Sequence, residues 1–289
     1  MEAASRPLLP FLVLAISLVG VSFGSIFVRL AAAPALAIAL WRMTMASAVV
    51  VPAAVASGAA RGRATVRDWS LAASAGGLLA LHFASWITSL QFTTVAASVL
   101  LVNTAPVFVA LLMWLIGQRP GSRTWLAIAL GLAGAAVIAA PDDGDRGSLL
   151  GNLLAIGGAV AMAAYLLLAR EAQRALPYVP YVAVAYGTAA AVLWASVLST
   201  GTPWRGFSPE TWIALAAMAA VSQLIGHGGY NWSLRHLSPA FVSIALTGEP
   251  VLASLLAWWL LDEPLTMRVV GGGVLVLAAI LVAARPAGR

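Results

Sequence analysis

Long apolar stretches separated by short polar joints run along almost the whole chain. A hydrocarbon core about 30 Å thick needs about 20 apolar residues per helix, and the chain divides into ten stretches of roughly that length. They cover residues 9–30, 35–57, 69–90, 94–117, 123–140, 149–169, 178–200, 210–230, 239–261 and 265–284. Helix-breaking residues such as Pro34, Pro120-Gly121 and Pro264 occupy the joints. The pattern predicts an all-α polytopic membrane protein with ten transmembrane helices.

Composition supports the same class. The chain is 62% hydrophobic and 9% charged, whereas soluble domains carry about 25% charged residues. It has no cysteine, which excludes disulfides and thiolate chemistry, and we expect neither a cofactor nor a metal. Arg6 before an apolar run suggests a signal peptide, but the run exceeds the 7–15 residues of such a peptide. We therefore expect the first helix to be retained.

A weak internal repeat relates residues 85–140 to residues 229–284 at an offset of 144. The offset aligns Trp114 with Trp258 and Pro106-Val107 with Pro250-Val251. We therefore divide the chain into five-helix repeats at 1–140 and 149–289, joined by a short acidic linker at 141–148. Because five is odd, the second repeat enters the membrane inverted, which predicts a central cavity that opens to either side by alternating access.

The basic residues, all of them arginines, predict the orientation. If the N-terminus is cytoplasmic, most arginines fall at cytoplasmic helix ends, as the positive-inside rule requires. This larger group comprises Arg6, Arg61, Arg63, Arg67, Arg119, Arg123, Arg170, Arg174, Arg235, Arg285 and Arg289. The opposite side holds Arg29, Arg146, Arg205 and Arg268. We expect both termini in the cytoplasm and, despite the net charge of +6, no nucleic-acid partner.

Four short motifs carry a family resemblance. They are Ala37-Ile38-Ala39-Leu40-Trp41-Arg42, Thr104-Ala105-Pro106-Val107, Gly248-Glu249-Pro250-Val251 and Leu260-Leu261-Asp262-Glu263-Pro264. With their order and spacing, the chain resembles the EamA-type proteins of the drug/metabolite transporter superfamily. The resemblance implies two inverted five-helix repeats around a central cavity in a bacterial inner membrane. It also implies export of amino acids or other small metabolites, and the chain looks closest to exporters with broad or aromatic preference. One departure is Arg119, which aligns with Glu263.

Glu249 is the only acidic residue that lies away from the ends of the predicted spans. Intramembrane ionisable groups are costly and normally face a bundle interior, so they are the first candidates for a site. Pro250 lacks an N–H and clashes with the preceding turn, which predicts a kink beside the carboxylate. Glu249 is thus expected to bind a substrate amine or a proton. The alternative is a structural pairing with a buried partner.

Arg42 lies about 10 Å inside the outer end of the second span, at 1.5 Å per residue. Its guanidinium is able to hold a substrate carboxylate in a bidentate fork. It is equally able to snorkel or to pair with Glu249 or a carbonyl. We favour a structural role, because the resemblance implies an arginine here in members with differing substrates.

Polar residues form a stripe on the eighth span. Gln223, His227, Tyr230 and Asn231 fall at positions i, i+4, i+7 and i+8 of a helix. On the third span His82 and Trp86 share one face, and the offset aligns Trp86 with Tyr230. Aromatic rings at equivalent places predict two walls of a cavity that stack on a substrate. The alternative is hydrogen bonding between helices with aromatic filling.

The remaining candidates flank the two prolines. Asn103 aligns with Thr247, and each lies three residues before its proline, while Ser243 lies one turn before Thr247. Tyr165 on the sixth span is a further candidate. The predicted substrate-binding set is His82, Trp86, Asn103, Tyr165, Gln223, His227, Tyr230, Ser243, Thr247 and Glu249. The predicted structural or hinge set is Arg42, Pro106 and Pro250.

These features favour a secondary transporter of small amphiphilic metabolites, with amino acids as the first expectation. No Gly-x-x-x-x-Gly-Lys loop is present in the sequence, so direct use of ATP is not expected. Proton coupling and facilitated exit both stay open. A multidrug or cation exporter is the alternative of the same class, and a lipid scramblase or intramembrane enzyme that of another class. The internal repeat predicts function as a monomer within membrane lipid.

Overall fold

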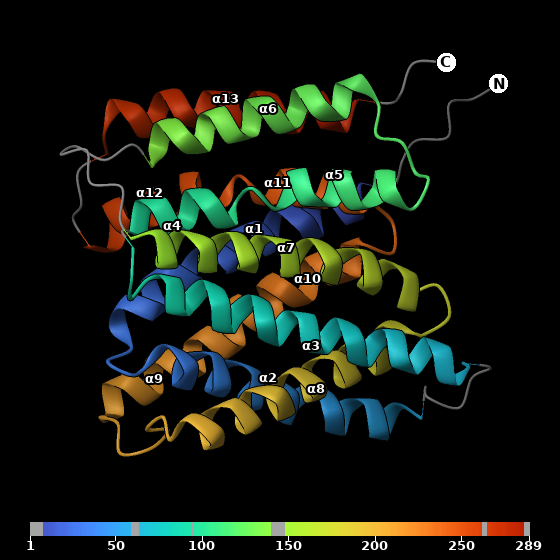
Figure 1. Ribbon diagram of the computed structural model, residues 1–289, viewed down its shortest axis with the longest axis vertical. Helices are drawn as coiled ribbons and strands as arrows, with labels where there is room; N and C mark the ends of the chain where they lie inside the picture. Colours follow the sequence, from blue (N-terminus) through green and yellow to red (C-terminus); the bar gives the residue numbers. More distant parts are fainter. Residues whose placement is uncertain (1–7, 59–63, 94, 140–147, 262–264, 286–289) are drawn as a thin grey trace.

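The computed structural model describes residues 8–58, 64–93, 95–139, 148–261 and 265–285, and this part of the chain is helical throughout with no strand (Figure 1). The first-repeat helices are α1 (Leu9–Leu30), α2 (Ala35–Ser57), α3 (Val66–Ser89), α4 (Val95–Val102), α5 (Ala105–Leu115) and α6 (Ser122–Ile138). The second-repeat elements are α7 (Leu149–Ala172), α8 (Tyr178–Thr200), α9 (Pro209–Ala217), η2 (Met218–His227), α10 (Gly228–Ser233), α11 (Pro239–Leu246), α12 (Glu249–Leu261) and α13 (Met267–Ala284). The acidic linker segment Asp142-Asp143-Gly144-Asp145 and Glu263 lie outside the described residues.

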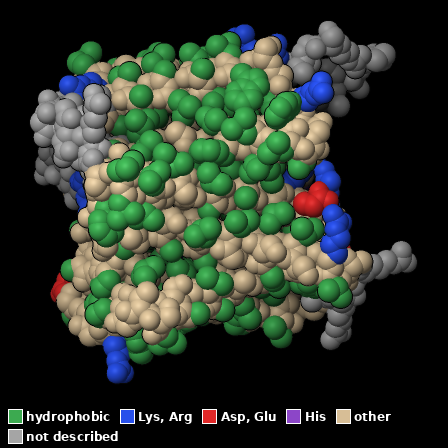
Figure 2. All heavy atoms as spheres, viewed as in Figure 1, with side chains coloured by type: hydrophobic (Ala, Val, Ile, Leu, Met, Phe, Trp, Pro, Cys, Tyr) green, Lys and Arg blue, Asp and Glu red, His purple; other side chains and the backbone are tan. Residues whose placement is uncertain are grey.

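Nine spans in the described residues are long and apolar enough to cross a bilayer, and the shorter apolar helix α6 makes a tenth. Several spans combine consecutive elements, such as Pro209–Ser233. Hydrophobic side chains cover the middle of the visible face, and most of the arginine spheres lie toward the ends of the helices (Figure 2). The prediction of an all-α, ten-span membrane protein is confirmed.

Helix packing follows a pseudo-two-fold relation between the repeats. At the offset of 144, α1 corresponds to α7, α2 to α8, α3 to the α9–α10 span, α5 to α12 and α6 to α13. The most extensive contacts come in related pairs: α3 packs along α7 as η2 and α10 pack along α1, and α5 meets α7 as α12 meets α1. The α2–α8 and α6–α13 pairs each join equivalent helices, which places them across the axis.

Both repeats break one transmembrane span at the same register. In the first repeat α4 ends at Val102 and α5 begins at Ala105; in the second, α11 ends at Leu246 and α12 begins at Glu249. Each break precedes a proline whose missing N–H leaves a carbonyl of the preceding turn without its usual helical partner. Tight turns bridge the gaps, with the Thr104 nitrogen donating to the Leu101 carbonyl at 3.1 Å and the Thr247 nitrogen to Ile244 at 3.1 Å.

The span that carries the predicted polar stripe is not a uniform α-helix. Residues Met218–His227 form a π-helix, whose hydrogen bonds reach one residue further than those of an α-helix. The wider turn changes the direction of each side chain relative to α-helical spacing. Residues four or five apart still lie close in direction in such a segment, but residues seven or eight apart diverge from the positions that α-helical spacing gives them.

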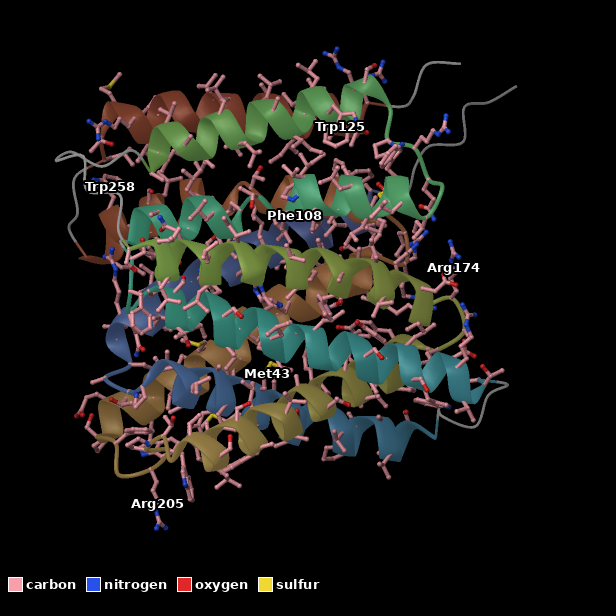
Figure 3. All side chains as sticks on the ribbon, viewed as in Figure 1. Met43, Phe108, Trp125, Arg174, Arg205 and Trp258 are labelled. Atoms are coloured by element: carbon pink, nitrogen blue, oxygen red, sulfur yellow. The ribbon has the colours of Figure 1, made fainter. Side chains whose placement is uncertain are left out.

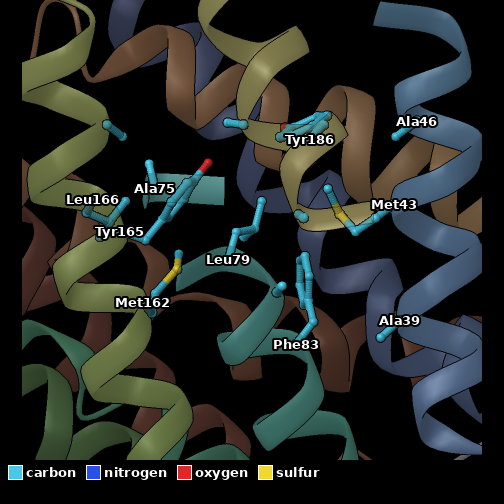
Figure 4. Packing of buried hydrophobic residues seen from close by; sticks show 14 of the residues in the cluster. Ala39, Met43, Ala46, Ala75, Leu79, Phe83, Met162, Tyr165, Leu166 and Tyr186 are labelled. Carbon is cyan, nitrogen blue, oxygen red and sulfur yellow. The ribbon is translucent and has the colours of Figure 1, made fainter. Parts of the chain in front are cut away.

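Small residues allow close backbone contacts between the helices. A Cβ on Gly20 of α1 would lie 2.9 Å from the Gly226 nitrogen of η2, and one on Gly76 of α3 would lie 2.3 Å from the Ala185 carbonyl of α8. Between these crossings, larger side chains fill the interior, where Met43, Phe83 and Tyr186 come from α2, α3 and α8 (Figure 4). Van der Waals packing of this kind holds helices together in lipid.

The α6–α13 pair supplies a test of this packing. A Cβ at Gly272 would lie 2.5 Å from Ile138 Cγ1 and 2.6 Å from the Gly134 carbonyl oxygen, whereas one at Gly271 would meet nothing within 4 Å. We expect Gly272→Val to destabilise the protein by roughly 1–3 kcal/mol, the usual cost of overpacking. Thermal unfolding in detergent measures the effect. The matched control is Gly271→Val, and an equal loss of stability in both variants would contradict the packing argument.

Candidate functional site

A cavity of about 60 Å³ lies among helices of both repeats. Its volume suffices for a few water molecules, whereas ligand pockets usually measure about 300–1,000 Å³. Its lining comprises Val21, Arg42, His82, Trp86, Val102, Asn103, Ala105, Pro106, Met162, Leu166, His227, Tyr230, Ser243, Leu246 and Glu249. Residues at the edges of both helix breaks belong to this set, so the irregular backbone borders the cavity.

Most of the predicted site residues meet at this cavity. The lining includes seven of the ten substrate-binding candidates, namely His82, Trp86, Asn103, His227, Tyr230, Ser243 and Glu249. Arg42 and Pro106, predicted as structural, also line it. Tyr165, Gln223, Thr247 and Pro250 lie outside the lining.

Glu249 is the first residue of α12, immediately after the break in the second repeat. The positive end of a helix dipole favours an anion at this position. Its main-chain carbonyl accepts a hydrogen bond from Ser22 Oγ at 3.4 Å. Within the described part of the chain, the Glu249 carboxylate has no ion-pair or hydrogen-bond partner. The carboxylate therefore has its acceptor capacity available to a ligand.

Arg42 is held firmly by neutral groups. Its Nε donates to Gln223 Oε1 at 2.7 Å, Nη2 donates to the Ser222 carbonyl at 3.4 Å, and Cζ lies 4.1 Å from the centroid of the Phe83 ring. A cation over an aromatic face is attracted by the ring quadrupole. The side chain is only 2% exposed. These contacts position the guanidinium at the cavity wall without a protein carboxylate against it.

The two histidines belong to one cluster of aromatic rings. His82 Nδ1 lies 2.9 Å from the Gly158 carbonyl. Because a carbonyl only accepts, this bond requires the proton on Nδ1 and leaves Nε2 as the acceptor of the neutral ring. The His82 ring stacks on Trp86, with centroids 6.1 Å apart. His227 Nδ1 pairs with the Tyr230 hydroxyl, and the centroids of the His82 and His227 rings are 6.5 Å apart.

The predicted residues outside the lining have structural contacts instead. Thr247 Oγ1 donates to the Ile244 carbonyl at 2.6 Å and faces Gly131 of α6. Tyr165 Oη accepts from Asn231 Nδ2 at 2.5 Å. Gln223 holds Arg42 through the contact described above. The predicted stripe divides: His227 and Tyr230 line the cavity, whereas Gln223 binds Arg42 and Asn231 binds Tyr165.

Sequence reasoning missed several residues of the site. Met162 and Leu166 line the cavity from α7, one turn apart, where Tyr165 was expected. Phe83 lies beneath Arg42, and its ring centroid is 5.0 Å from that of His227. The offset of 144 aligns Phe83 with His227 and was the available signal for this residue. Met162 and Leu166 are ordinary apolar residues and carried no such signal.

The cavity offers binding groups of both signs and a donor that is not used internally. Among the described residues, the Trp86 indole nitrogen is buried without a hydrogen-bond partner. Buried polar groups are normally satisfied, so an unused donor at a cavity wall is a place for a water or a ligand oxygen. Glu249 supplies an acceptor, Arg42 a positive charge, and the Trp86 and Tyr230 rings flat apolar surface.

Comparisons with known proteins agree with this architecture. The chain matches the EamA-like transporter family over residues 8–140 and 149–285. It is 27% identical over 207 residues to an uncharacterized transporter of Archaeoglobus fulgidus, covering 71% of this chain and 73% of the relative. It is 25% identical over 226 residues to the uncharacterized transporter YwfM of Bacillus subtilis, covering 75% of this chain and 74% of that one.

A solved structure shares the fold. It superposes with a TM-score of 0.80 at 20% sequence identity, over 95% of this chain and 96% of the other, and its title, "Crystal structure of protein", states no activity. The family match covers two segments that together make up nearly the whole chain. This protein is therefore a multi-pass membrane protein that belongs to the EamA-like transporter family.

Proposed function

We propose that the protein is a secondary transporter that exports small amphiphilic metabolites, with amino acids as its principal substrates. One observation carries the proposal: the Glu249 carboxylate, without a hydrogen-bond or ion-pair partner among the described residues, shares a cavity between the repeats with Arg42 and two aromatic rings. A zwitterion with an apolar side chain complements these groups. Its ammonium group pairs with Glu249, and its side chain lies against Trp86 and Tyr230.

Arg42 contributes chiefly as an anchor in this scheme. Its Nε and one Nη already donate to Gln223 and Ser222, so the full bidentate fork is not free. The positive charge still favours a substrate carboxylate nearby. Recognition of the amine by a carboxylate and of the side chain by rings therefore dominates the proposed specificity.

The paired helix breaks support transport by alternating access. The cavity is smaller than a typical ligand site, so binding requires the surrounding helices to move apart. Pro106 and Pro250 lie beside the breaks and are proposed as hinges for α5 and α12. The five-helix repeats 1–140 and 149–289 would then rock against one another around the cavity.

The proposed orientation places both termini in the cytoplasm. The start of α1 and the end of α13 lie at the same end of the bundle, and Arg174 points outward at that end, whereas Arg205 lies toward the opposite end (Figure 3). The cell membrane of a bacterium is the proposed location and a monomer the proposed unit. A proton is the proposed coupling ion, taken up by Glu249 when the substrate amine leaves.

A multidrug or cation exporter is the second candidate. The same carboxylate and ring faces suit a planar or quaternary cation, which binds aromatic faces well. The two candidates differ in what competes for the cavity: amino acids in the first, toxic cations in the second.

Replacing the carboxylate tests the proposal directly. Glu249→Gln keeps the shape of the side chain but removes its charge, so we expect at least a tenfold loss of amino-acid transport and loss of its response to a pH gradient. The measurement is uptake of radiolabelled amino acids into vesicles that contain the purified protein, with and without the gradient. Glu210→Gln is the matched control, because Glu210 is an exposed acidic residue at the start of α9.

Three other results would contradict parts of the proposal. Gradient-independent transport that survives in Glu249→Gln would assign a structural role to Glu249 and facilitated exit to the protein. Displacement of a bound cation by cations and not by amino acids would favour the multidrug candidate. Equal loss in Glu210→Gln would remove the special role of the cavity carboxylate.

The anchoring role of Arg42 is tested by a double-mutant cycle with Gln223. Arg42→Lys keeps the charge but loses the Nε donor, and Gln223→Leu removes the acceptor. We expect each variant to lower the free energy of unfolding by about 1–3 kcal/mol, and the double variant to lose less than the sum. Unfolding in SDS, followed by tryptophan fluorescence, measures these energies.

Gln91→Leu is the control partner, because Gln91 is exposed and its combination with Arg42→Lys should be additive. The anchoring role would be wrong if Arg42→Lys kept normal stability and weakened only the binding of zwitterionic or anionic substrates. That result would make Arg42 a direct ligand of the substrate carboxylate.

A further inference from the structure

A second cavity, of about 550 Å³, lies away from the central one and opens beside the end of α7. It is separate in its lining, which comprises Arg67, Leu71, Leu112, Met113, Ile116, Gln118, Ala164, Leu167, Leu168, Arg170, Glu171, Arg174, Ser238 and Pro239. These residues come from the start of α3, the end of α5, the end of α7 and the start of α11. We call this cavity the α5–α7 groove.

The α5–α7 groove has an apolar inner part and a basic mouth. Along α7 the lining changes from Ala164, Leu167 and Leu168 to Arg170 and Arg174, a span of about 15 Å at 1.5 Å per residue. That length is close to half the thickness of a hydrocarbon core of about 30 Å. The apolar part therefore lies at the depth of acyl chains and the arginines at the depth of lipid headgroups.

The charges at the mouth are partly uncompensated. Arg174 pairs with Glu171 at 2.6 Å, and Arg170 donates to the Leu234 carbonyl, which is neutral. Arg67 lies across the groove at the start of α3 and is exposed. The lining holds three arginines against one carboxylate, and with Asp68 beside Arg67 the mouth keeps a local excess of one positive charge.

The outer wall of the groove is continuous with a surface that faces lipid. On α5 the side chains of Leu111, Leu115 and Ile116 are 40%, 71% and 61% exposed. Exposed apolar side chains of this size on a spanning helix lie in the hydrocarbon region. An occupant with acyl chains therefore reaches the groove from within the bilayer, without crossing water.

We propose that the α5–α7 groove binds an anionic phospholipid, with the phosphate at Arg67, Arg170 and Arg174 and an acyl chain along Leu112, Leu167 and Leu168. Basic pockets between transmembrane helices bind acidic headgroups, and each arginine near the surface contributes favourably. The site shares no lining residue with the central cavity. The bound lipid links α5, which follows one helix break, to α7, and so bears on the movement of that helix.

Lipid binding is tested by native mass spectrometry of the purified full chain. The probe is dioleoyl phosphatidylglycerol, compared with dioleoyl phosphatidylcholine at the same concentration. We expect one phosphatidylglycerol to bind with a preference on the order of tenfold over phosphatidylcholine. The variant Arg67→Gln/Arg174→Gln should lose that preference, since both side chains are exposed and their replacement leaves the core intact.

The matched control is Arg119→Gln/Arg235→Gln, which removes the same charge from exposed residues outside the groove lining. This control should keep the preference. Equal losses in the two double variants would overturn the proposal in favour of general surface charge. Equal binding of phosphatidylcholine, or displacement of the lipid by inorganic phosphate at equal concentration, would overturn it as well.

Discussion

The requirement that every backbone polar group find a partner inside the bilayer governs this structure. Irregular backbone is tolerated at membrane depth only where it is buried in protein or lines a cavity. The two interruptions, between Val102 and Ala105 and between Leu246 and Glu249, obey this rule. All four of these residues border the central cavity, and tight turns satisfy the backbone between them. Each proline frees a carbonyl, and the cavity is where such a carbonyl is least costly.

Close contacts between small residues bring the helices near enough for a few large polar side chains to reach one another. Gly20 and Gly226 bring α1 against η2, and on the same span Gln223 reaches Arg42. A buried guanidinium needs its donors occupied, because an unpaired charge in a low dielectric is costly. Gln223, Ser222 and the Phe83 ring meet this need with neutral groups, and so leave Glu249 without a competing protein cation in contact. The close packing of α1 against η2 thereby places Gln223 beside Arg42, and Glu249 is left as the cavity charge without a hydrogen-bond or ion-pair partner among the described residues.

Much of the fold was readable from the sequence, because hydrophobic length and an offset of 144 residues are properties of the chain itself. The direction of individual side chains was harder to predict from the sequence. Spacing by 3.6 residues placed Gln223 and His227 on one face, but only His227 lines the cavity. Tyr165 was also expected there, but Met162 and Leu166 occupy the position. A π-helix depends on tertiary contacts such as the close approach of Gly226 to Val21, which no local pattern reports. The role of Phe83 depends on its contact with Arg42, which lies far from it in the sequence.

The two repeats share the arrangement of their helices but carry different polar residues at equivalent positions. At the offset of 144, Glu249 corresponds to Ala105, Arg42 to Tyr186 and His82 to Gly226, whereas Trp86 corresponds to another aromatic residue, Tyr230. Symmetric packing is what permits the same movement toward either side of a membrane. The single carboxylate in the lining makes the cavity asymmetric, because only the end of the cavity at Glu249 attracts a positive charge. The described part of the chain thus combines a scaffold that repeats with a site that does not, since the Glu249 carboxylate and the Arg42 guanidinium each occur in one repeat only.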